Sequence, residues 1–163
     1  NQVIGRDVPG MDIKSHLPTI EKVGILKAHP FTPEHLQTVN DGNMIQTGEF
    51  ITMVYCSNCH SPSETGIRPL HRYFPEGVDQ AVMEKYVKGV LTTGNIVYMP
   101  KMPMLDSEVK AISAYLVMNN NNNGAPAAIK TAIQQEVEAR DRALVKKLGA
   151  DNVASLEIVQ ETK

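Results

Sequence analysis

The chain has 163 residues, of which 42% are apolar and 21% are charged, values that are ordinary for a globular protein of one domain with extensions. The formal net charge is −2 and no basic stripe occurs, which argues against a nucleic-acid-binding protein. No apolar stretch approaches the roughly 18 residues that a membrane-spanning helix needs, so we expect no transmembrane segment. Aromatic residues make up only 5% and Trp is absent, so a large apolar cofactor would help to fill the core.

The first third of the chain carries many residues that interrupt regular structure. Proline and glycine recur through residues 1–47, which predicts a mostly irregular N-terminal extension with one short helix around 34–39. Residues 48–58 are compatible with a helix that leads into the two cysteines. Residues 61–75 contain three prolines and a glycine and are predicted to form a loop.

Two further helices are predicted in the second third. Asp79 can cap a helix that runs to Leu91, with one apolar face formed by Val82, Tyr86 and Val90. Prolines exclude a regular helix over 95–105. Asp106 can cap the next helix, which is predicted to end near Met118. Its apolar face comprises Val109, Ile112, Tyr115 and Leu116.

The last part of the chain begins with a run of asparagines. Residues 119–125 contain five consecutive asparagines and then Gly124, a composition of poor helix propensity that predicts an Asn-rich linker. Pro126 suits the first turn of a helix and Gly149 its end, so residues 126–163 are predicted to form an extra C-terminal amphipathic helix and a tail. Its apolar stripe comprises Ile129, Ile133, Val137, Leu144 and Leu148. The predicted fold class is therefore all-α.

The chemistry of the chain is indicated by the run Cys56-Ser57-Asn58-Cys59-His60, which matches the C-x-x-C-H signature for covalent haem attachment. Two intervening residues let both thiols reach neighbouring vinyl groups of one porphyrin. The histidine that follows can then present its imidazole to the iron from the same side. The sequence predicts one covalent haem c, with Cys56 and Cys59 as its anchors and His60 as the proximal ligand.

Three other interpretations of the cysteine pair are weaker. A disulfide across so short a loop constrains little chain entropy. A thioredoxin-like C-x-x-C belongs to a βαβ context, which is missing here. A zinc site needs two further ligands, and although His71 could supply one, the sequence has no second pair at suitable spacing.

From about residue 48 to 118 the chain resembles a class I cytochrome c domain. Gly48 stands eight residues before Cys56, as in the glycine-led first helix of that family. The run Gly66-Ile67-Arg68-Pro69-Leu70 is similar to the family's loop after the haem motif, and a middle helix, a Met-Pro segment and a last helix follow in the family's order. Residues 1–47 and 119–163 lie outside the resemblance.

The resemblance implies a distal methionine ligand. Three methionines are available in the segment Tyr98-Met99-Pro100-Lys101-Met102-Pro103-Met104. We favour Met99, because it heads the first Met-Pro and leaves enough chain to turn back into the last helix. Met102 is the alternative and Met104 lies too close to the helix start. All three could instead be apolar packing, since methionine fills irregular gaps well.

The resemblance also implies roles for residues around the haem. The carbonyl of Pro69 would accept a hydrogen bond from the proximal imidazole and raise its basicity, unless Pro69 is a simple turn proline. Arg72 could pair with a haem propionate, or could be a solvated surface residue. Ligation by a second histidine, from His71 or from the extension at His16, His29 or His35, is a weaker alternative to the methionine.

A saturated His/Met iron exchanges single electrons and binds no substrate, so the predicted function is one-electron transfer rather than enzymatic catalysis. The amphipathic C-terminal helix favours a cytochrome subunit of a larger oxidoreductase or respiratory complex, which would make other redox proteins its partners. The alternatives are a freely diffusing periplasmic carrier and, more weakly, a haem sensor or enzyme with an open iron site. The family implies a periplasmic or other extracytoplasmic location in bacteria, and we expect a signal peptide to have been removed before Asn1.

Overall fold

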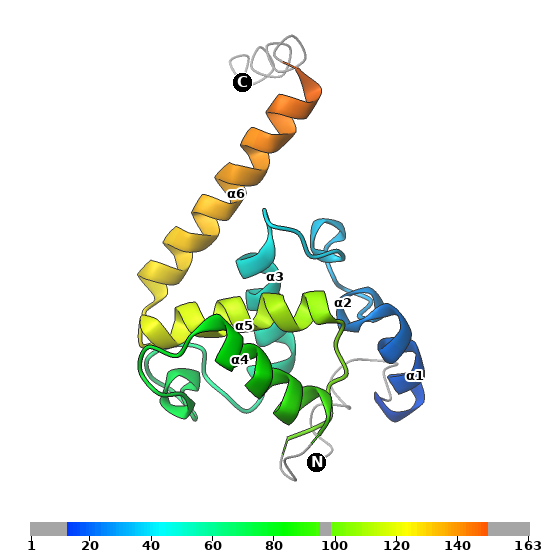
Figure 1. The fold of residues 1–163 in the computed structure, drawn as a ribbon, viewed down its shortest axis with the longest axis vertical. Coiled ribbons are helices and arrows are strands. Elements are labelled where there is room, and N and C mark those ends of the chain that lie inside the picture. The colour runs from blue at the N-terminus through cyan, green and yellow to red at the C-terminus, as the bar shows by residue number, and fades with distance from the viewer. Residues whose placement is uncertain (1–12, 95–98, 150–163) are drawn as a thin grey trace.

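The computed structural model describes residues 13–94 and 99–149, and all regular structure in these ranges is helical. This confirms the predicted all-α class, with no strand in the described part of the chain. None of these helices is long and apolar enough to cross a membrane. The elements in Figure 1 are α1 (Ile13–Val23), α2 (Ile25–Ala28), a 3-10 turn (Glu34–Leu36), α3 (Met44–Ile51), a π-helical turn (Thr52–Cys56), a 3-10 turn (Leu70–Tyr73), α4 (Gln80–Val87), a π-helical turn (Lys88–Thr92), α5 (Asp106–Asn121) and α6 (Pro126–Leu148).

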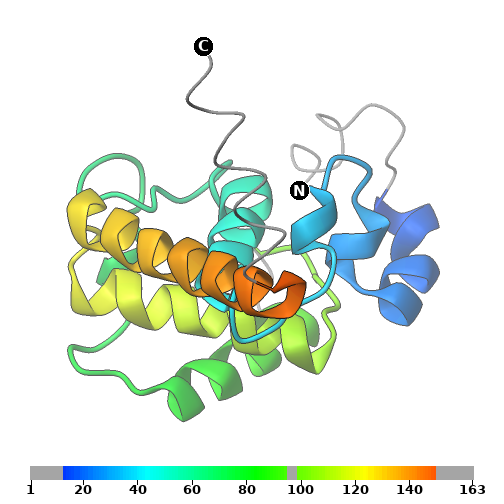
Figure 2. The ribbon, with the colours of Figure 1, turned by 90° about the horizontal axis from the view of Figure 1, so that it is seen from above.

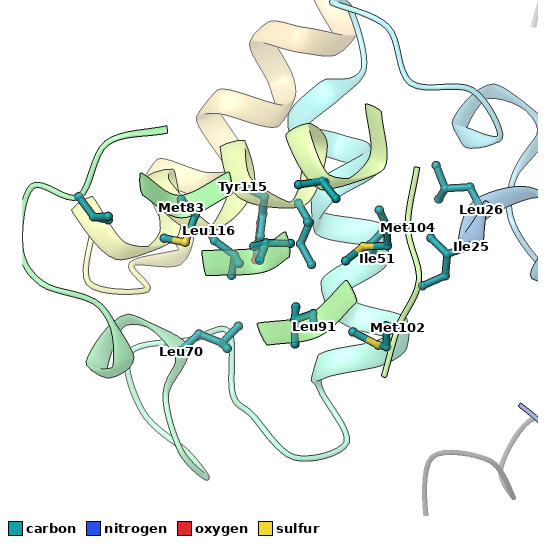
Figure 3. Packing of buried hydrophobic residues seen from close by; sticks show 14 of the residues in the cluster. Ile25, Leu26, Ile51, Leu70, Met83, Leu91, Met102, Met104, Tyr115 and Leu116 are labelled. Atoms are coloured by element: carbon teal, nitrogen blue, oxygen red, sulfur yellow. The ribbon is translucent and has the colours of Figure 1, made fainter. Parts of the chain in front are cut away.

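The centre of the fold is the crossing of α3 and α5, with α4 packed along α5 (Figures 1 and 2). The two backbones meet at Gly48, where an added Cβ would overlap the carbonyl group of Ala111 and lie 2.8 Å from the Cβ of Tyr115. Only glycine permits so close a helix crossing. The core around it contains the side chains labelled in Figure 3, which come from α2, α3, the 3-10 turn at 70–73, α4, the turn after it, the Met-Pro segment and α5.

The N-terminal extension is more ordered than its composition predicts, because its described part holds α1, α2 and a 3-10 turn. The prediction of a mostly irregular extension was therefore wrong for residues 13–47, and Pro18 even lies inside α1. The reason is tertiary: Ile20, Ile25 and Leu26 are each at most 5% exposed in the main core, and such burial offsets a cost of about 3 kcal/mol for a proline within a helix. Glu108 of α5 also accepts hydrogen bonds from the backbone N–H groups of Ile25 (3.1 Å) and Leu26 (3.0 Å).

Helix α3 starts four residues earlier than predicted, at Met44, and its cap comes from a distant part of the chain. The Glu136 carboxylate on α6 accepts from the N–H groups of Ile45 (2.5 Å) and Gln46 (2.6 Å). A carboxylate at this position satisfies free N–H groups and favours the positive end of the helix dipole. Beyond Ile51 the helix widens into the π-helical turn that ends at Cys56.

The predicted cap of α4 is confirmed, but its predicted apolar face is not the most deeply buried one, although Val90 packs against the core. Asp79 accepts from the N–H group of Val82 at 2.8 Å. Val82 itself is 51% exposed, and the core instead receives Met83, Val87 and Leu91, one residue further along. The period was therefore right and the phase wrong, because the direction of a helix face depends on where neighbouring helices lie.

The last long helix of the domain, α5, buries the predicted stripe but begins and ends differently. Val109, Ile112, Tyr115 and Leu116 are all at most 4% exposed, as predicted. The cap position is occupied by Leu105 rather than Asp106, and the side chain of Glu108 accepts from the N–H group of Leu105 at 2.8 Å.

The Asn-rich segment at 119–125 is not a simple linker, because α5 continues to Asn121. Asn119 is 1% exposed and Asn120 is 6% exposed. Their amides bind the carbonyl oxygens of Pro62 (2.5 Å) and Pro75 (2.9 Å). The linker prediction failed here because buried partners outweigh the poor helix propensity of asparagine.

Helix α6 begins at Pro126 and stops before Gly149, whose φ is 79°, as predicted. Its first half packs on the domain: Ile129 is 6% exposed and Ile133 lies against the core. Its second half extends beyond the other helices in Figure 1, with Leu144 at 52% and Val145 at 44% exposure.

Candidate functional site

The C-x-x-C-H run folds as a closed turn at the end of the α3 helix. The carbonyl oxygen of Cys56 accepts hydrogen bonds from the N–H groups of Cys59 (3.0 Å) and His60 (2.8 Å). The π-helical turn before it is closed by the N–H group of Ser57 on the carbonyl of Thr52, at 3.1 Å. Single π-helical turns within α-helices are found frequently at functional sites. The structure thus brings both cysteines and the histidine into one compact turn.

The two thiols are free and differ in their surroundings. Cys56 is half-buried and Cys59 is exposed. Burial, and next the neighbouring Cys59, raise the pKa of the Cys56 thiol to about 12. At neutral pH Cys56 is therefore a protonated thiol, whereas the nucleophilic cysteine of a thioredoxin-like site needs a lowered pKa. This environment argues against the thioredoxin-like alternative.

The imidazole of His60 is oriented by two contacts. Its Nδ1 atom lies 3.2 Å from the carbonyl oxygen of Arg68. A carbonyl can only accept, so Nδ1 carries the proton and the neutral ring has its lone pair on Nε2. The ring of Tyr73 meets the imidazole edge to face, with centroids 5.0 Å apart and planes at 86°. Nε2 is thus the ring nitrogen whose lone pair is available to a ligand.

The partner of the imidazole differs from the one we predicted. The acceptor is the carbonyl of Arg68, not that of Pro69, whose carbonyl accepts from the N–H group of Arg72 at 3.1 Å. Arg68 has a positive φ of 47°, and this local reversal of the chain occurs where its carbonyl meets His60. Pro69 is buried and opens the 3-10 turn 70–73, which fits the turn-proline interpretation. Arg72 is exposed on that turn and its proposed pairing with a propionate stays a prediction.

The three methionines of the Met-Pro segment fall into two environments. Met102 (7% exposed) and Met104 (8%) belong to the hydrophobic core near Ile51 and Leu91 (Figure 3). The N–H group of Met102 is bound to the carbonyl of Leu91 at 2.8 Å. Met99 is half-buried at the edge of the same core. Tyr98 and the three residues before it lie outside the described residues.

The remaining histidines are dispersed. His29 is buried against the rings of Phe31, Phe50 and Tyr55, and burial lowers its pKa. His35 is exposed, and the side chain of His16 lies outside the described residues. The Nδ1 atom of His71 is buried and makes no hydrogen bond within the described part of the chain. Residues 13–94 and 99–149 contain no group of three or more His, Cys, Asp or Glu side chains arranged to hold a metal ion, so the zinc alternative gains no support there.

Sequence reasoning missed Asn119 and Asn120, which hold the loops on either side of the 3-10 turn 70–73. A signal for them was present, because positions 119 and 120 continue the buried stripe of Tyr115 and Leu116 at a spacing of four residues. The asparagine run concealed that periodicity. No sequence signal distinguished the carbonyl of Arg68 from that of Pro69.

Comparisons of the chain with protein-family models, with curated proteins and with solved structures give no match.

Proposed function

We propose that the protein transfers single electrons by means of one covalently bound haem c. Cys56 and Cys59 would anchor it through thioether bonds, and His60 and Met99 would ligate its iron, with Met102 as the alternative to Met99. The observation that carries the proposal is the Cys56–His60 turn, whose backbone hydrogen bonds hold two free cysteines beside an imidazole that is bonded through Nδ1.

The residues of the turn fit the haem. Covalent attachment needs two reduced thiols, and both cysteines are free. Ligation needs an imidazole whose far nitrogen is fixed, and the Arg68 carbonyl fixes it. A bound haem c supplies a ferric–ferrous couple. The hydrogen bond to Arg68 makes His60 a stronger donor, which favours the ferric state, while a thioether ligand favours the ferrous state.

We propose that residues 48–118 form a class I cytochrome c domain. Gly48 is one of the residues on which the resemblance rests, and it lies where α3 and α5 cross too closely for any side chain. The haem motif, the loop at 61–69, α4, the Met-Pro segment and α5 follow in the expected order.

The proposed partner is a larger oxidoreductase or respiratory complex, of which this chain would be the cytochrome subunit. The exposed apolar side chains Leu144 and Val145 on the second half of α6 support a protein partner. The alternative is a freely diffusing periplasmic carrier. It is favoured by the first half of α6, where Ile129 is buried against the domain and Glu136 binds α3, so this half needs no partner protein to cover it. Both versions place the protein outside the bacterial cytoplasm, where covalent haem attachment takes place.

The decisive experiment is expression with a periplasmic cytochrome c maturation system. We expect a red protein whose haem stays with the polypeptide on a denaturing gel. The double variant Cys56→Ser/Cys59→Ser should lose this covalent haem while its expression is retained. A colourless wild-type protein after correct maturation would overturn the proposal.

Two measurements separate the alternatives. Carbon monoxide should leave the absorption spectrum of the reduced protein unchanged if a methionine closes the site, whereas rapid binding would favour a sensor or enzyme. Sedimentation of the natively purified protein should show a larger assembly, and a lone species near 17.9 kDa would favour the free carrier.

A further inference from the structure

We propose that Asn119 is a positioning residue for the His60 imidazole, acting through the loop that carries the Arg68 carbonyl. The inference rests on the proposed function, since it assigns a residue that tunes the proximal ligand. It also gives a role to the asparagine run, whose composition alone indicates only a linker.

The loop after the haem motif is held together at Ser61. Its N–H group donates to the carbonyl of Ile67 at 2.7 Å, and its own carbonyl accepts from the N–H group of Leu70 at 2.9 Å. Ile67 and Leu70 flank Arg68 and Pro69 in the sequence. The position of Ser61 therefore determines where the Arg68 carbonyl lies relative to His60.

Asn119 fixes the residue next to that anchor. Its Nδ2 atom donates to the carbonyl of Pro62 at 2.5 Å, and its side chain is almost fully buried. The end of α5 also packs on the loop at Gly124, where an added Cβ would lie 2.7 Å from the backbone of Ser63 and Glu64. Segment 62–64 is thus held at two points at the C-terminal end of α5, by the Asn119 amide and by the close contact with Gly124.

The consequence for the imidazole follows from hydrogen-bond energetics. Loss of the Asn119 amide leaves the half-buried Pro62 carbonyl without its donor, which favours displacement of the loop toward water. Displacement of Ser61 moves the Arg68 carbonyl and weakens its bond to Nδ1 of His60. A weaker bond makes the imidazole a poorer donor, so the ferric state loses stability and the reduction potential rises.

The chain provides a matched control in the next residue. Asn120 is also buried and donates through Nδ2 to a proline carbonyl, that of Pro75, at 2.9 Å. Pro75 follows the 3-10 turn 70–73, outside the segment from Ser61 to Leu70. The substitutions Asn119→Leu and Asn120→Leu therefore remove similar bonds from the same helix, and only the first touches the loop that carries the Arg68 carbonyl.

The test uses both haem-loaded variants. We measure the reduction potential, the hyperfine-shifted NMR resonances of the His60 ring in the ferric protein, and urea unfolding. Both variants should lose stability, but only Asn119→Leu should raise the potential and shift the Nδ1 proton resonance. Equal shifts of the potential and the resonance in the two variants, or no shift in Asn119→Leu, would overturn the inference. The proposed function would still hold in either case, provided that the wild-type protein carries haem.

A milder variant keeps the test informative if Asn119→Leu fails to mature. Asn119→Ser shortens the side chain and removes the amide with less steric disturbance, and it should shift the potential and the Nδ1 resonance in the same direction. An unshifted, correctly loaded Asn119→Ser protein would overturn the inference. A wild-type protein without haem would instead refute the proposed function itself.

Discussion

The Nδ1 atom of His60 lies 3.2 Å from the carbonyl oxygen of Arg68, a residue whose own backbone has a φ of 47°. The left-handed region costs a non-glycine residue roughly 1–2 kcal/mol. The fold therefore places a strained residue beside the histidine that it orients. Strain of this kind tends to concentrate at functional sites, where the surrounding structure holds it in place.

This strain leads to a prediction for Arg68. Arg68→Gly should retain the acceptor carbonyl and change stability by less than about 1 kcal/mol, because relief of strain offsets the greater freedom of glycine in the unfolded chain. Arg68→Val should destabilise the protein by at least about 1 kcal/mol, since a β-branched residue is poorly tolerated at positive φ. Urea unfolding of the two variants measures the difference, and equal stabilities would contradict the strain argument.

The helix crossing predicts a large effect at one glycine and a small one at another. Gly48→Ala should destabilise the protein by about 3 kcal/mol, because the new methyl group overlaps the Ala111 carbonyl and neither backbone can easily move. Gly89→Ala is the control: beyond its chain neighbours and the backbone of its own helix, no atom lies within 4 Å of its added Cβ, and alanine favours helical structure. It should be neutral or stabilising by up to about 1 kcal/mol, as thermal unfolding would show.

The contact between α6 and α3 predicts that a residue of the C-terminal helix stabilises the domain. Glu136→Ala removes the acceptor of the Ile45 and Gln46 N–H groups and should cost about 2 kcal/mol. Glu138→Ala, an exposed carboxylate on the same helix, should cost less than about 0.5 kcal/mol. If both variants unfold at the same urea concentration, α6 does not cap α3 in solution.

The choice of distal ligand can be tested with volume-conserving variants. If the protein carries the proposed haem, Met99→Leu should open the reduced iron to carbon monoxide, seen as a rapid change in absorption. Met102→Leu should leave the spectrum unchanged and cost less than about 1.5 kcal/mol, because leucine fills nearly the same buried volume. The reverse pattern would identify Met102 as the ligand.

Alkaline pH should destabilise the protein through Tyr115. Burial, and then the charge of Glu49, raise the pKa of the Tyr115 phenol from 10.0 to about 12. Above pH 10 the unfolded chain loses this proton while the folded protein keeps it, so the unfolded state binds fewer protons and stability falls as pH rises. Between pH 10 and 12 the loss should be roughly 2 kcal/mol.

The control for this pH effect is Tyr115→Phe. The variant lacks the ionisable phenol, so its stability should fall less steeply between pH 10 and 12. Urea unfolding at a series of pH values measures both slopes. Parallel slopes would show that other groups cause the alkaline loss.

The sequence by itself determined the all-α class, the cap of α4 at Asp79, the buried stripe of α5 and the Cys56–His60 motif. These features depend on local chemistry: side-chain caps, helical periodicity and the spacing of two thiols before an imidazole are all visible within a few residues. Only the tertiary structure decided that the Glu136 side chain caps the start of α3 and that Pro18 is tolerated inside a helix. It also decided that Asn119 and Asn120 continue α5 and bind loop carbonyls from buried positions. In each case the stabilising partner lies far away in the sequence, and its burial or hydrogen bond outweighs the local preference. The same reason separates Arg68 from Pro69 as the acceptor for His60, since the direction of a loop carbonyl depends on how the loop is held.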